Sequence, residues 1–321
     1  MKKLDIGIIM DPISQIKYYK DSSFAMMLEA QNRGYTIYYM EIQDLFMKSE
    51  IPMARVRKVK VYDKPDIWYQ FTSEESLIEL SSLDVVLMRK DPPFDMQYIY
   101  ATYILEFAEK LVNHPIIVNK PQSLRDANEK MFTLNFPECI VPTVVSRDFS
   151  DFQAFIEQHQ DVIIKPLDGM GGRSIFRIQQ GDPNTNVILE SVTNNQQSFV
   201  MMQRFIPEIT EGDKRILLID GDPIDYALAR IPSVGENRGN LASGGQGQGI
   251  ALNERDYWIC DQIKPTLKAK GLIFVGLDVI GDYITEINVT SPTCIRELDS
   301  QFNLNISATM FDKLEKYCHE K

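Results

Sequence analysis

One stretch decides how the chain folds: Gly276-Leu277-Asp278-Val279-Ile280-Gly281-Asp282-Tyr283-Ile284-Thr285-Glu286-Ile287-Asn288-Val289-Thr290-Ser291-Pro292. In its second half apolar and polar residues alternate, which predicts a strand with one polar face. Glu286 and Asn288 are two residues apart and therefore point to the same side, roughly 7 Å apart along the strand. Asp278 lies on the apolar run before the Gly281-Asp282 turn. Two carboxylates and one amide oxygen, with no His or Cys in the stretch, are typical of a Mg²⁺ or Mn²⁺ site.

The register of this hairpin decides whether the three side chains meet. A two-residue turn at Gly281-Asp282 would set Asp278 opposite Thr285, on the face away from Glu286. A three-residue loop over 281–283 would set Asp278 opposite Glu286 and put all three oxygens on one face. We predict the longer loop or a bulge. The alternative is an ordinary edge hairpin with a polar face.

Length and charge narrow the possible functions. At 321 residues the chain is long enough for two or three lobes. The net charge of −11 argues against nucleic acid as the main partner, because phosphate binding needs a basic surface. Four cysteines without a CxxC spacing and three scattered histidines argue against a zinc site and favour reduced thiols in a cytosolic protein. We also expect no signal peptide and no membrane span, since no run of 18 apolar residues occurs.

The first part of the chain alternates predicted strands and helices. Strands are expected over 4–10, 36–40, 83–88 and 115–118, with helices from a cap at 21–23 to Gly34 and over 98–111. This order predicts an open parallel sheet with helices on both faces, in which ligands bind beyond the carboxyl ends of strands. Asp11 and Arg89 follow two such ends, so we expect substrate contacts there. The alternative is that both are capping and loop residues.

The pattern of two other segments is less clear. The basic stretch from Ser49 to Asp66 could be a basic patch, but it favours a solvated pair of strands. Ser123 or Asp126 could start a helix that carries Lys130 on its inner turns.

A glycine-rich turn follows a strand with a single lysine. The strand predicted over 161–167 contains Lys165, and Asp168-Gly169-Met170-Gly171-Gly172-Arg173 follows it, before a second strand over 174–178. Backbone N–H groups in such a turn can approach an anion closely. The GxxxxGK[ST] spacing of a P-loop is absent. A buried lysine is costly unless it meets an anion, so we predict a phosphate clamp rather than a plain glycine hairpin.

Candidate ligand-binding residues and a cluster of glycines lie between 199 and 249. After a strand predicted over 199–206, Asp213 is suited to accept from a sugar hydroxyl, and Arg215 and Arg230 to hold carboxylates or phosphates. Six glycines then occur between 235 and 249. So long a segment without predicted structure is either disordered or a lid. Arg238 within it favours a lid that delivers an arginine onto an anionic substrate.

Taken together, these motifs resemble the ATP-grasp superfamily. Five longer segments resemble the bacterial type of glutathione synthetase, and this resemblance extends over nearly the whole chain. The segments that carry this second resemblance are Met10-Asp11-Pro12, Asp21-Ser22-Ser23-Phe24-Ala25-Met26, Met88-Arg89-Lys90-Asp91-Pro92-Pro93-Phe94-Asp95, Val118-Asn119-Lys120-Pro121-Gln122-Ser123-Leu124-Arg125 and Glu286-Ile287-Asn288-Val289-Thr290-Ser291-Pro292-Thr293.

The resemblance implies a Mg²⁺- (or Mn²⁺-) dependent ligase that uses ATP to join γ-glutamylcysteine to glycine, in the cytoplasm and often as a homotetramer. It implies an N-terminal α/β domain over 1–125, on the substrate side. An ATP-grasp domain over 126–321 would follow, of α+β type, with a small ATP lobe over about 126–205. The large lobe would carry a flexible lid over 231–249 and the magnesium site. The implied partners are small molecules, with neither nucleic acid nor a membrane.

The resemblance also assigns roles to single residues. Asp278, Glu286 and Asn288 would ligate magnesium, while Asp11, Arg89 and Arg230 would contact substrate. Arg215, Arg238 and Arg296 would act in catalysis, on the dipeptide, the glycine carboxylate and transition-state charge. ATP would be bound by Lys130, Lys165, Gly169, Met170, Gly171, Gly172, Gln203, Arg204, Phe205, Ile206 and Asp213. The family usually has a small polar residue where Arg204 stands, but backbone groups would read the adenine there.

Such a ligase converts a carboxylate to an acyl phosphate, which an amine then attacks. The protein mainly positions the reactants and neutralises charge, consistent with a sequence that lacks a Ser/His or Cys/His constellation. Two alternatives stay open: another ATP-grasp carboxylate–amine ligase, of the D-alanine or glutamate ligase type, and a non-catalytic ATP-binding module.

Overall fold

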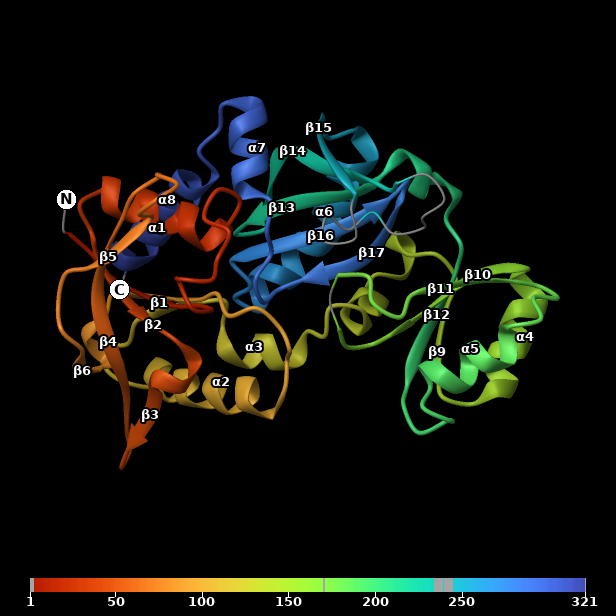
Figure 1. Cartoon of the computed structure of the whole chain (residues 1–321), viewed down its shortest axis with the longest axis horizontal. Coiled ribbons are helices and arrows are strands. Elements are labelled where there is room, and N and C mark those ends of the chain that lie inside the picture. Colours follow the sequence, from red (N-terminus) through yellow and green to blue (C-terminus); the bar gives the residue numbers. More distant parts are fainter. Residues whose placement is uncertain (1–2, 170, 234–238, 240–244, 321) are drawn as a thin grey trace.

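Three β-sheets follow one another along the molecule in the computed structural model. It describes residues 3–169, 171–233, 239 and 245–320. Figure 1 shows an N-terminal sheet at the left, a five-stranded sheet in the middle and a four-stranded sheet at the right. None of the helices in these ranges is long and apolar enough to cross a membrane.

The N-terminal sheet has the predicted parallel centre. Its central order is β2-β1-β7-β8, from the strands β1 (Asp5–Ile9), β2 (Thr36–Met40), β7 (Val85–Met88) and β8 (Ile116–Val118). Helices α1 (Ser22–Asn32) and α2 (Met96–Glu109) cover opposite faces of this sheet. Neighbouring residues of β1 therefore belong to different hydrophobic cores, one beneath each helix. Asp21 caps α1 as predicted, accepting a 2.7 Å hydrogen bond from the Phe24 N–H. The C-terminal helix α8 (Ile306–Glu320) packs beside α1.

An antiparallel extension replaces the solvated strand pair that we expected over 49–66. That expectation is wrong: β4 (Ile51–Val61) is one eleven-residue strand that pairs with β2 and with three short strands. These are β3 (Leu45–Lys48), β5 (Tyr69–Phe71) and β6 (Ser76–Glu79). Alternate residues of β4 are buried, and the guanidiniums of Arg55 and Arg57 lie 4.7 and 3.7 Å from the centres of aromatic rings. The basic residues therefore form the outer face of a strand.

The middle sheet is antiparallel, in the order β15-β14-β13-β16-β17. Its strands are β13 (Asp213–Ile219), β14 (Asp222–Ile231), β15 (Gln246–Ala251), β16 (Phe274–Ile280) and β17 (Tyr283–Asn288). Helix α6 (Glu254–Ala269) covers one face and α7 (Ile295–Phe302) the other. Every residue of the central strand β13 is buried. The charged residues at its start therefore need partners within the fold.

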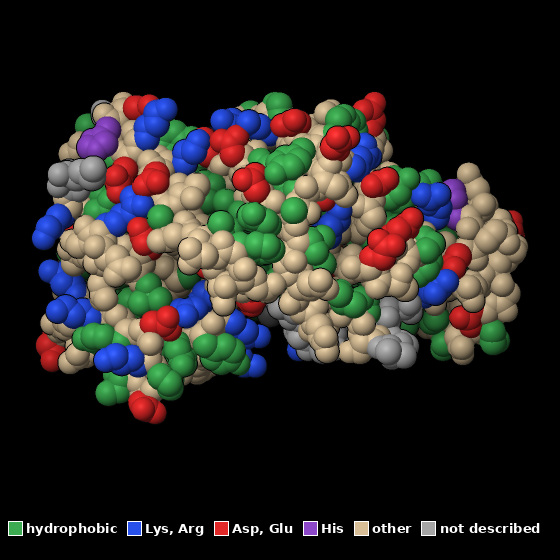
Figure 2. Space-filling view, turned by 90° about the horizontal axis from the view of Figure 1, so that it is seen from above, with side chains coloured by type: hydrophobic (Ala, Val, Ile, Leu, Met, Phe, Trp, Pro, Cys, Tyr) green, Lys and Arg blue, Asp and Glu red, His purple; other side chains and the backbone are tan. Residues whose placement is uncertain are grey.

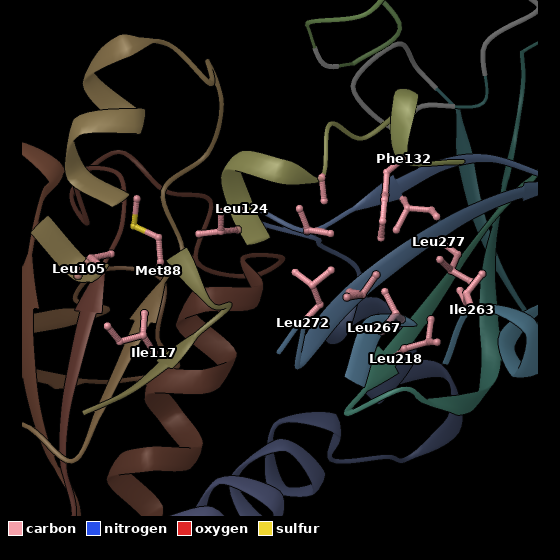
Figure 3. Close-up of a cluster of buried hydrophobic side chains, with 14 of the residues drawn as sticks. Met88, Leu105, Ile117, Leu124, Phe132, Leu218, Ile263, Leu267, Leu272 and Leu277 are labelled. Atoms are coloured by element: carbon pink, nitrogen blue, oxygen red, sulfur yellow. The ribbon is translucent and has the colours of Figure 1, made fainter. Parts of the chain in front are cut away.

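One hydrophobic core joins the first two sheets. Figure 3 follows it from Met88 and Ile117, through Leu124 on helix α3 (Pro121–Asp126), to Leu272 and to Leu277 on strand β16 of the middle sheet. All five of these side chains are buried. The N-terminal and middle sheets therefore form one packed body.

The four-stranded sheet has a core of its own. Its order is β11-β10-β12-β9, from the strands β9 (Thr143–Ser146), β10 (Asp161–Pro166), β11 (Phe176–Gln179) and β12 (Val200–Arg204). Helices α4 (Phe149–His159) and α5 (Thr185–Val192) pack on it, and Phe152, Ile164 and Leu189 are fully buried between them. We call this unit the small lobe; it forms a narrower projection at the right of Figure 2. A separate core lets the lobe move as a unit.

The segment between α3 and the small lobe corrects one expectation. Lys130 is not on a helix, because α3 ends at Asp126 and short 3₁₀ turns follow over Met131–Asn135 and Pro137–Cys139. The Asn128 side chain causes the change by accepting hydrogen bonds from the N–H groups of Lys130 (3.1 Å) and Met131 (2.9 Å).

Candidate active site

The β16–β17 hairpin contains the predicted bulge. Its turn is the short one, Gly281-Asp282, and pairs Ile280 with Tyr283. The register then shifts, so that Asp278 faces Glu286 and Thr285 is the extra residue. The bulge turns the Thr285 carbonyl toward the small lobe, where it accepts a 3.0 Å hydrogen bond from Lys165 Nζ. One extra residue therefore brings two carboxylates together and supplies a contact between the lobes.

Two arginines hold Asp278 from the neighbouring strands. Arg215 lies directly opposite it on β13 and donates from Nε (2.5 Å) and Nη2 (3.1 Å). Arg230 Nη2 on β14 lies 2.9 Å from Asp278 Oδ2. Burial alone would raise the pKa of Asp278, but the two guanidiniums outweigh it and hold the pKa well below its usual range. Asp278 is therefore a firmly ionised carboxylate at the centre of the sheet.

Asp213 is a second buried carboxylate in the same network. It is the register partner of Arg230, which donates to Asp213 Oδ2. Its Oδ1 atom is buried and has no hydrogen-bond partner among the described residues. Burial raises the pKa of Asp213 to about 7, although the Arg230 charge opposes this. An unpartnered buried acceptor beside a cavity is suited to a hydroxyl donor from a ligand.

Two buried lysines face this sheet. Lys165, on β10 of the small lobe, is 4% exposed, and burial lowers its pKa. Lys130 is 3% exposed and pairs with Glu129, while its Nζ lies 3.5 Å from Glu286 Oε1 and 3.4 Å from the Gly169 carbonyl. The two ammonium groups thus approach the hairpin from the small lobe and its connecting segment.

A narrow cavity of about 100 Å³ lies between the small lobe and the middle sheet. Its lining includes every described residue that we predicted to bind ATP: Lys130, Lys165, Gly169, Gly171, Gly172, Gln203, Arg204, Phe205, Ile206 and Asp213. Met170 lies outside the described residues. Ligand pockets usually measure roughly 300–1,000 Å³. The cavity is therefore narrower in this structure than a usual ligand pocket.

Some backbone N–H and carbonyl groups at the edge of this cavity already have hydrogen-bond partners. The N–H groups of Arg204 and Phe205 donate to the Pro142 carbonyl (3.1 Å) and the Asp161 carbonyl (2.9 Å). The Ile206 carbonyl accepts from the Ile209 N–H at 3.2 Å. The Ile206 N–H is therefore the best placed donor for a bound base. Arg204 itself is exposed, and its guanidinium lies 5.7 Å from the centre of the Tyr283 ring.

A wider cavity of about 520 Å³ adjoins the narrow one at the hairpin. The two cavities share Gly171, Asp278 and Glu286, so they meet at the bulge. The wider one is also lined by Asp11, Arg89, Arg215, Arg230 and Asn288. The wider cavity is therefore lined by all three residues that we predicted to contact substrate.

Arg89 lines the wider cavity directly after the end of β7. It is 4% exposed, with Nε 3.1 Å from Ser23 Oγ and Nη2 2.8 Å from the Pro292 carbonyl. Its Nη1 atom has no hydrogen-bond partner among the described residues. Burial lowers the pKa of Arg89, because no carboxylate bonds it directly. A carboxylate of a ligand would satisfy this nitrogen.

The donor set at the hairpin fits a hard divalent cation. Asp278, Glu286 and Asn288 all line the wider cavity, as the one-face prediction requires. The two arginines use three of the roughly four acceptor positions of the Asp278 carboxylate, so one remains. The described residues contain no group of three or more His, Cys, Asp and Glu side chains arranged for a metal. Two carboxylates and an amide instead suit Mg²⁺, which usually takes further oxygens from phosphates and water.

Arg296 is the predicted site residue that the structure does not bring to either cavity. Its Nη2 atom lies 2.7 Å from Asp63 Oδ2, on the surface beside the N-terminal sheet. The next residue of α7, Glu297, lines the wider cavity instead. One step along a helix turns the side chain by about 100°, which the linear sequence did not resolve. Arg238 lies outside the described residues.

Two residues of the site were missed in the sequence. Glu129 lines the wider cavity and pairs with Lys130, and burial and the Glu286 charge raise its pKa. Its position next to Lys130 was a usable signal. Thr285 acts through its carbonyl, so no side-chain pattern could have identified it.

Comparisons with known proteins match nearly the whole length of the chain. Residues 4–125 match the model of the prokaryotic glutathione synthetase N-terminal domain, and residues 129–303 that of the prokaryotic glutathione synthetase ATP-grasp domain. The chain is 57% identical over 313 residues to a glutathione synthetase of Vibrio vulnificus (strain YJ016), covering 98% of each chain. It is 55% identical over 312 residues to one of Escherichia coli O127:H6, covering 97% of this chain and 98% of that one.

Solved structures share the fold at low sequence identity. The ATP-grasp ligase PsnB in complex with a minimal precursor, Mg and ADP is 17% identical, with a TM-score of 0.64 over 99% of each chain. The D-cycloserine synthetase DcsG is 13% identical, with a TM-score of 0.61 over 96% of this chain and 99% of that one.

Proposed function

The chain belongs to the prokaryotic glutathione synthetase family, and we propose that its reaction takes place where the two cavities meet. The protein is an ATP-dependent carboxylate–amine ligase that joins γ-glutamylcysteine to glycine, giving glutathione, ADP and phosphate. The observation that carries the proposed site is the sharing of Gly171, Asp278 and Glu286 by both cavities. A nucleotide in the narrow cavity would direct its terminal phosphate toward a carboxylate in the wide one.

The narrow cavity is assigned to ATP. Lys130 and Lys165 hold its phosphates, and the loop over 169–172 covers them with backbone N–H groups. The unpartnered Asp213 oxygen accepts from a ribose hydroxyl, and the Ile206 N–H donates to the adenine. Lys165 supports this assignment, because its buried ammonium bonds a carbonyl and carries a lowered pKa, which a phosphate would reverse.

The wide cavity is assigned to the dipeptide and glycine. Arg89 Nη1 receives a substrate carboxylate, and the nearby Asp11 helps to orient the same end of the dipeptide. Arg215 and Arg230 lie beside the shared carboxylate, where they neutralise charge on the transferring phosphoryl group. Arg296 is not part of this proposal.

The proposed chemistry has two steps. An oxygen of the dipeptide's C-terminal carboxylate attacks the γ-phosphorus of ATP, and ADP leaves with the electron pair of the broken P–O bond. The glycine amine then attacks the acyl carbon, phosphate leaves, and the amine loses a proton. The protein forms no covalent bond in either step, so buried cations and the exclusion of water carry the catalysis.

Asp278, Glu286 and Asn288 hold the Mg²⁺ (or Mn²⁺) ion in this proposal. The bound ion neutralises phosphate charge in addition to the arginines and lysines. Arg215 and Arg230 keep Asp278 ionised, so this ligand is ready at all physiological pH values.

The remaining features rest on the resemblance to relatives. We propose a cytoplasmic homotetramer, divided into an N-terminal domain over 1–125 and an ATP-grasp domain over 126–321. The four free cysteines are compatible with a reducing compartment.

The test is ADP release with ATP, Mg²⁺ and γ-glutamylcysteine, with and without glycine, together with assay of glutathione. We expect glycine-dependent ADP release matched by glutathione, and loss of both in Glu286→Ala. We expect Arg89→Met to raise KM for the dipeptide at unchanged KM for ATP, while Arg147→Met, an exposed arginine of the small lobe, changes neither. ATP binding without turnover on any acceptor would refute the ligase assignment. Turnover with D-alanine or glutamate in place of glycine would change the assigned acceptor substrate and leave the assigned site unchanged.

A further inference from the structure

Arg173 directly follows the loop over 169–172 and brings a positive charge to the narrow cavity. It lines that cavity together with Gly172 before it and Ile175 after it. Its side chain is exposed, and among the described residues it forms no ion pair and no hydrogen bond. The proposed function gives a role to the backbone N–H groups of the loop but none to this side chain.

The other cations that line the narrow cavity already have partners. Lys130 pairs with a neighbouring carboxylate, Lys165 donates to a backbone carbonyl, and the Arg204 guanidinium lies over an aromatic ring. Within the described lining, Arg173 is therefore the cation whose charge has no partner in the protein. A free guanidinium beside a cavity assigned to a polyanion is suited to bind that anion.

The same loop carries a carboxylate that would repel phosphate. Asp168 and Arg173 are the two charged residues of the segment 168–174. Both line the narrow cavity, and no ion pair joins them. Asp168 alone would oppose the binding of phosphates beneath the loop, because like charges repel. Arg173 offsets this charge, so the loop as a whole does not repel an anion.

The chain brings Arg173 close to the junction of the two cavities. Gly171 lines both of them, where the terminal phosphate of ATP would meet the dipeptide. Two residues of chain span at most roughly 7 Å, so the Arg173 Cα lies within this distance of the Gly171 Cα. Arg173 does not line the wide cavity. It also borders a separate cavity of about 280 Å³, so its side chain has room to change rotamer.

We propose that Arg173 is a third phosphate-binding cation of the nucleotide site, after Lys130 and Lys165, and that it binds the β-phosphate. Its guanidinium can donate to two phosphate oxygens at once in a fixed geometry, which an ammonium group cannot do. The same contact is made in ATP and in ADP, since the β-phosphate stays with the nucleotide. This inference rests on the proposed function only for the assignment of ATP to the narrow cavity.

The test is isothermal titration calorimetry of the full chain with ATP, ADP and AMP in the presence of Mg²⁺. We expect Arg173→Met to weaken the binding of ATP and ADP by about tenfold, as the loss of one charge-assisted hydrogen bond would, and that of AMP by less than about twofold. Arg173→Lys keeps the charge but not the planar fork, so it should recover part of the loss. The loss should shrink as ionic strength rises, because Arg173 is exposed.

Turnover separates this role from a catalytic one. A contact made equally before and after phosphoryl transfer contributes to binding and not to the stabilisation of the transition state. In Arg173→Met we therefore expect KM for ATP to rise by about tenfold at unchanged kcat and unchanged KM for the dipeptide.

Arg204→Met is the matched control, because Arg204 is also an exposed arginine that lines the narrow cavity. It is two residues from Ile206, whose N–H is proposed to bind the base. Any change in this variant should therefore be the same for ATP, ADP and AMP. Arg147→Met, at an exposed arginine outside both cavities, should alter none of the three affinities.

The outcomes separate this inference from the proposed function. Unchanged ATP affinity in Arg173→Met, or an equal loss for ATP, ADP and AMP, would overturn the phosphate contact and leave the ligase assignment intact. The expected pattern of affinities in a protein that makes no glutathione would uphold the contact and refute the ligase assignment. A wild type that binds no nucleotide would refute both.

Discussion

Replacing Asp278 with Asn should destabilise the fold far more than an ordinary loss of a salt bridge. The Asp278, Arg215 and Arg230 side chains are 3%, 8% and 5% exposed. Removing the charge leaves the buried Arg215 guanidinium without a counter-ion and leaves Arg230 with Asp213 alone, and breaking a buried pair usually costs about 3–5 kcal/mol. The side chain keeps its size, so no cavity contributes to this loss.

Asp161→Asn is the matched control. Asp161 also binds one arginine through two atoms, at 2.9 and 2.6 Å, but Asp161 and Arg177 are 29% and 32% exposed. Exposed pairs contribute about 0.2–1 kcal/mol, so the two variants should differ by about 3 kcal/mol. Urea unfolding without ATP, followed by circular dichroism, measures both losses, and the slope m should stay unchanged. Equal losses in the two variants would refute the idea that this network holds the middle sheet.

The pH dependence gives a second check on the same variant. The pKa of Asp278 is held well below its usual range, so its contribution to stability is fully present above the unfolded pKa of about 4. The free-energy gap between wild type and Asp278→Asn should therefore stay constant from neutral pH down to about pH 4 and shrink below it. A gap that closes between pH 7 and 5 would contradict this.

Three further changes test other parts of the site. Lys165→Met removes a buried ammonium group that bonds only a carbonyl among the described residues. We expect Tm to stay the same or rise, and the ATP affinity measured by calorimetry to be at least about tenfold weaker. A lower Tm would contradict this. Burial raises the pKa of Asp213 to about 7, so the folded protein keeps a proton that the unfolded chain loses. The stability of wild type relative to Asp213→Asn should therefore fall from about pH 4 to pH 7 and then level off in urea titrations, and a rise over this range would refute the assignment. In Gly276→Ala the added Cβ would lie 2.8 Å from Pro292 Cβ and 3.0 Å from Arg215 Cδ. We therefore expect the free energy of unfolding to fall by about 1–3 kcal/mol and kcat to fall as well. An unchanged kcat would show that Arg215 tolerates the shift.

Much of the site could be predicted because its residue types are specific to its chemistry. Lys130, Lys165, Asp213 and the glycine loop come from distant segments, yet they line one cavity as expected. Two residues lie elsewhere than expected. Arg296 points away because a helix turns neighbouring side chains to different faces. Lys130 is not on the helix predicted for it, because the Asn128 side chain accepts hydrogen bonds from the N–H groups of Lys130 and Met131.

The sequence by itself determined the elements and the donor types. Alternation of apolar and polar residues and the caps set the strands and α1, and the carboxylates, the amide and the lysines indicated phosphate and metal chemistry. The tertiary structure alone decided which charges neutralise one another. Strand register set Arg215 opposite Asp278 and Arg230 opposite Asp213, and the bulge at Thr285 brought Glu286 to the same face. The physical reason is that pairing energies depend on distance and burial, which arise only when segments far apart in the chain pack together.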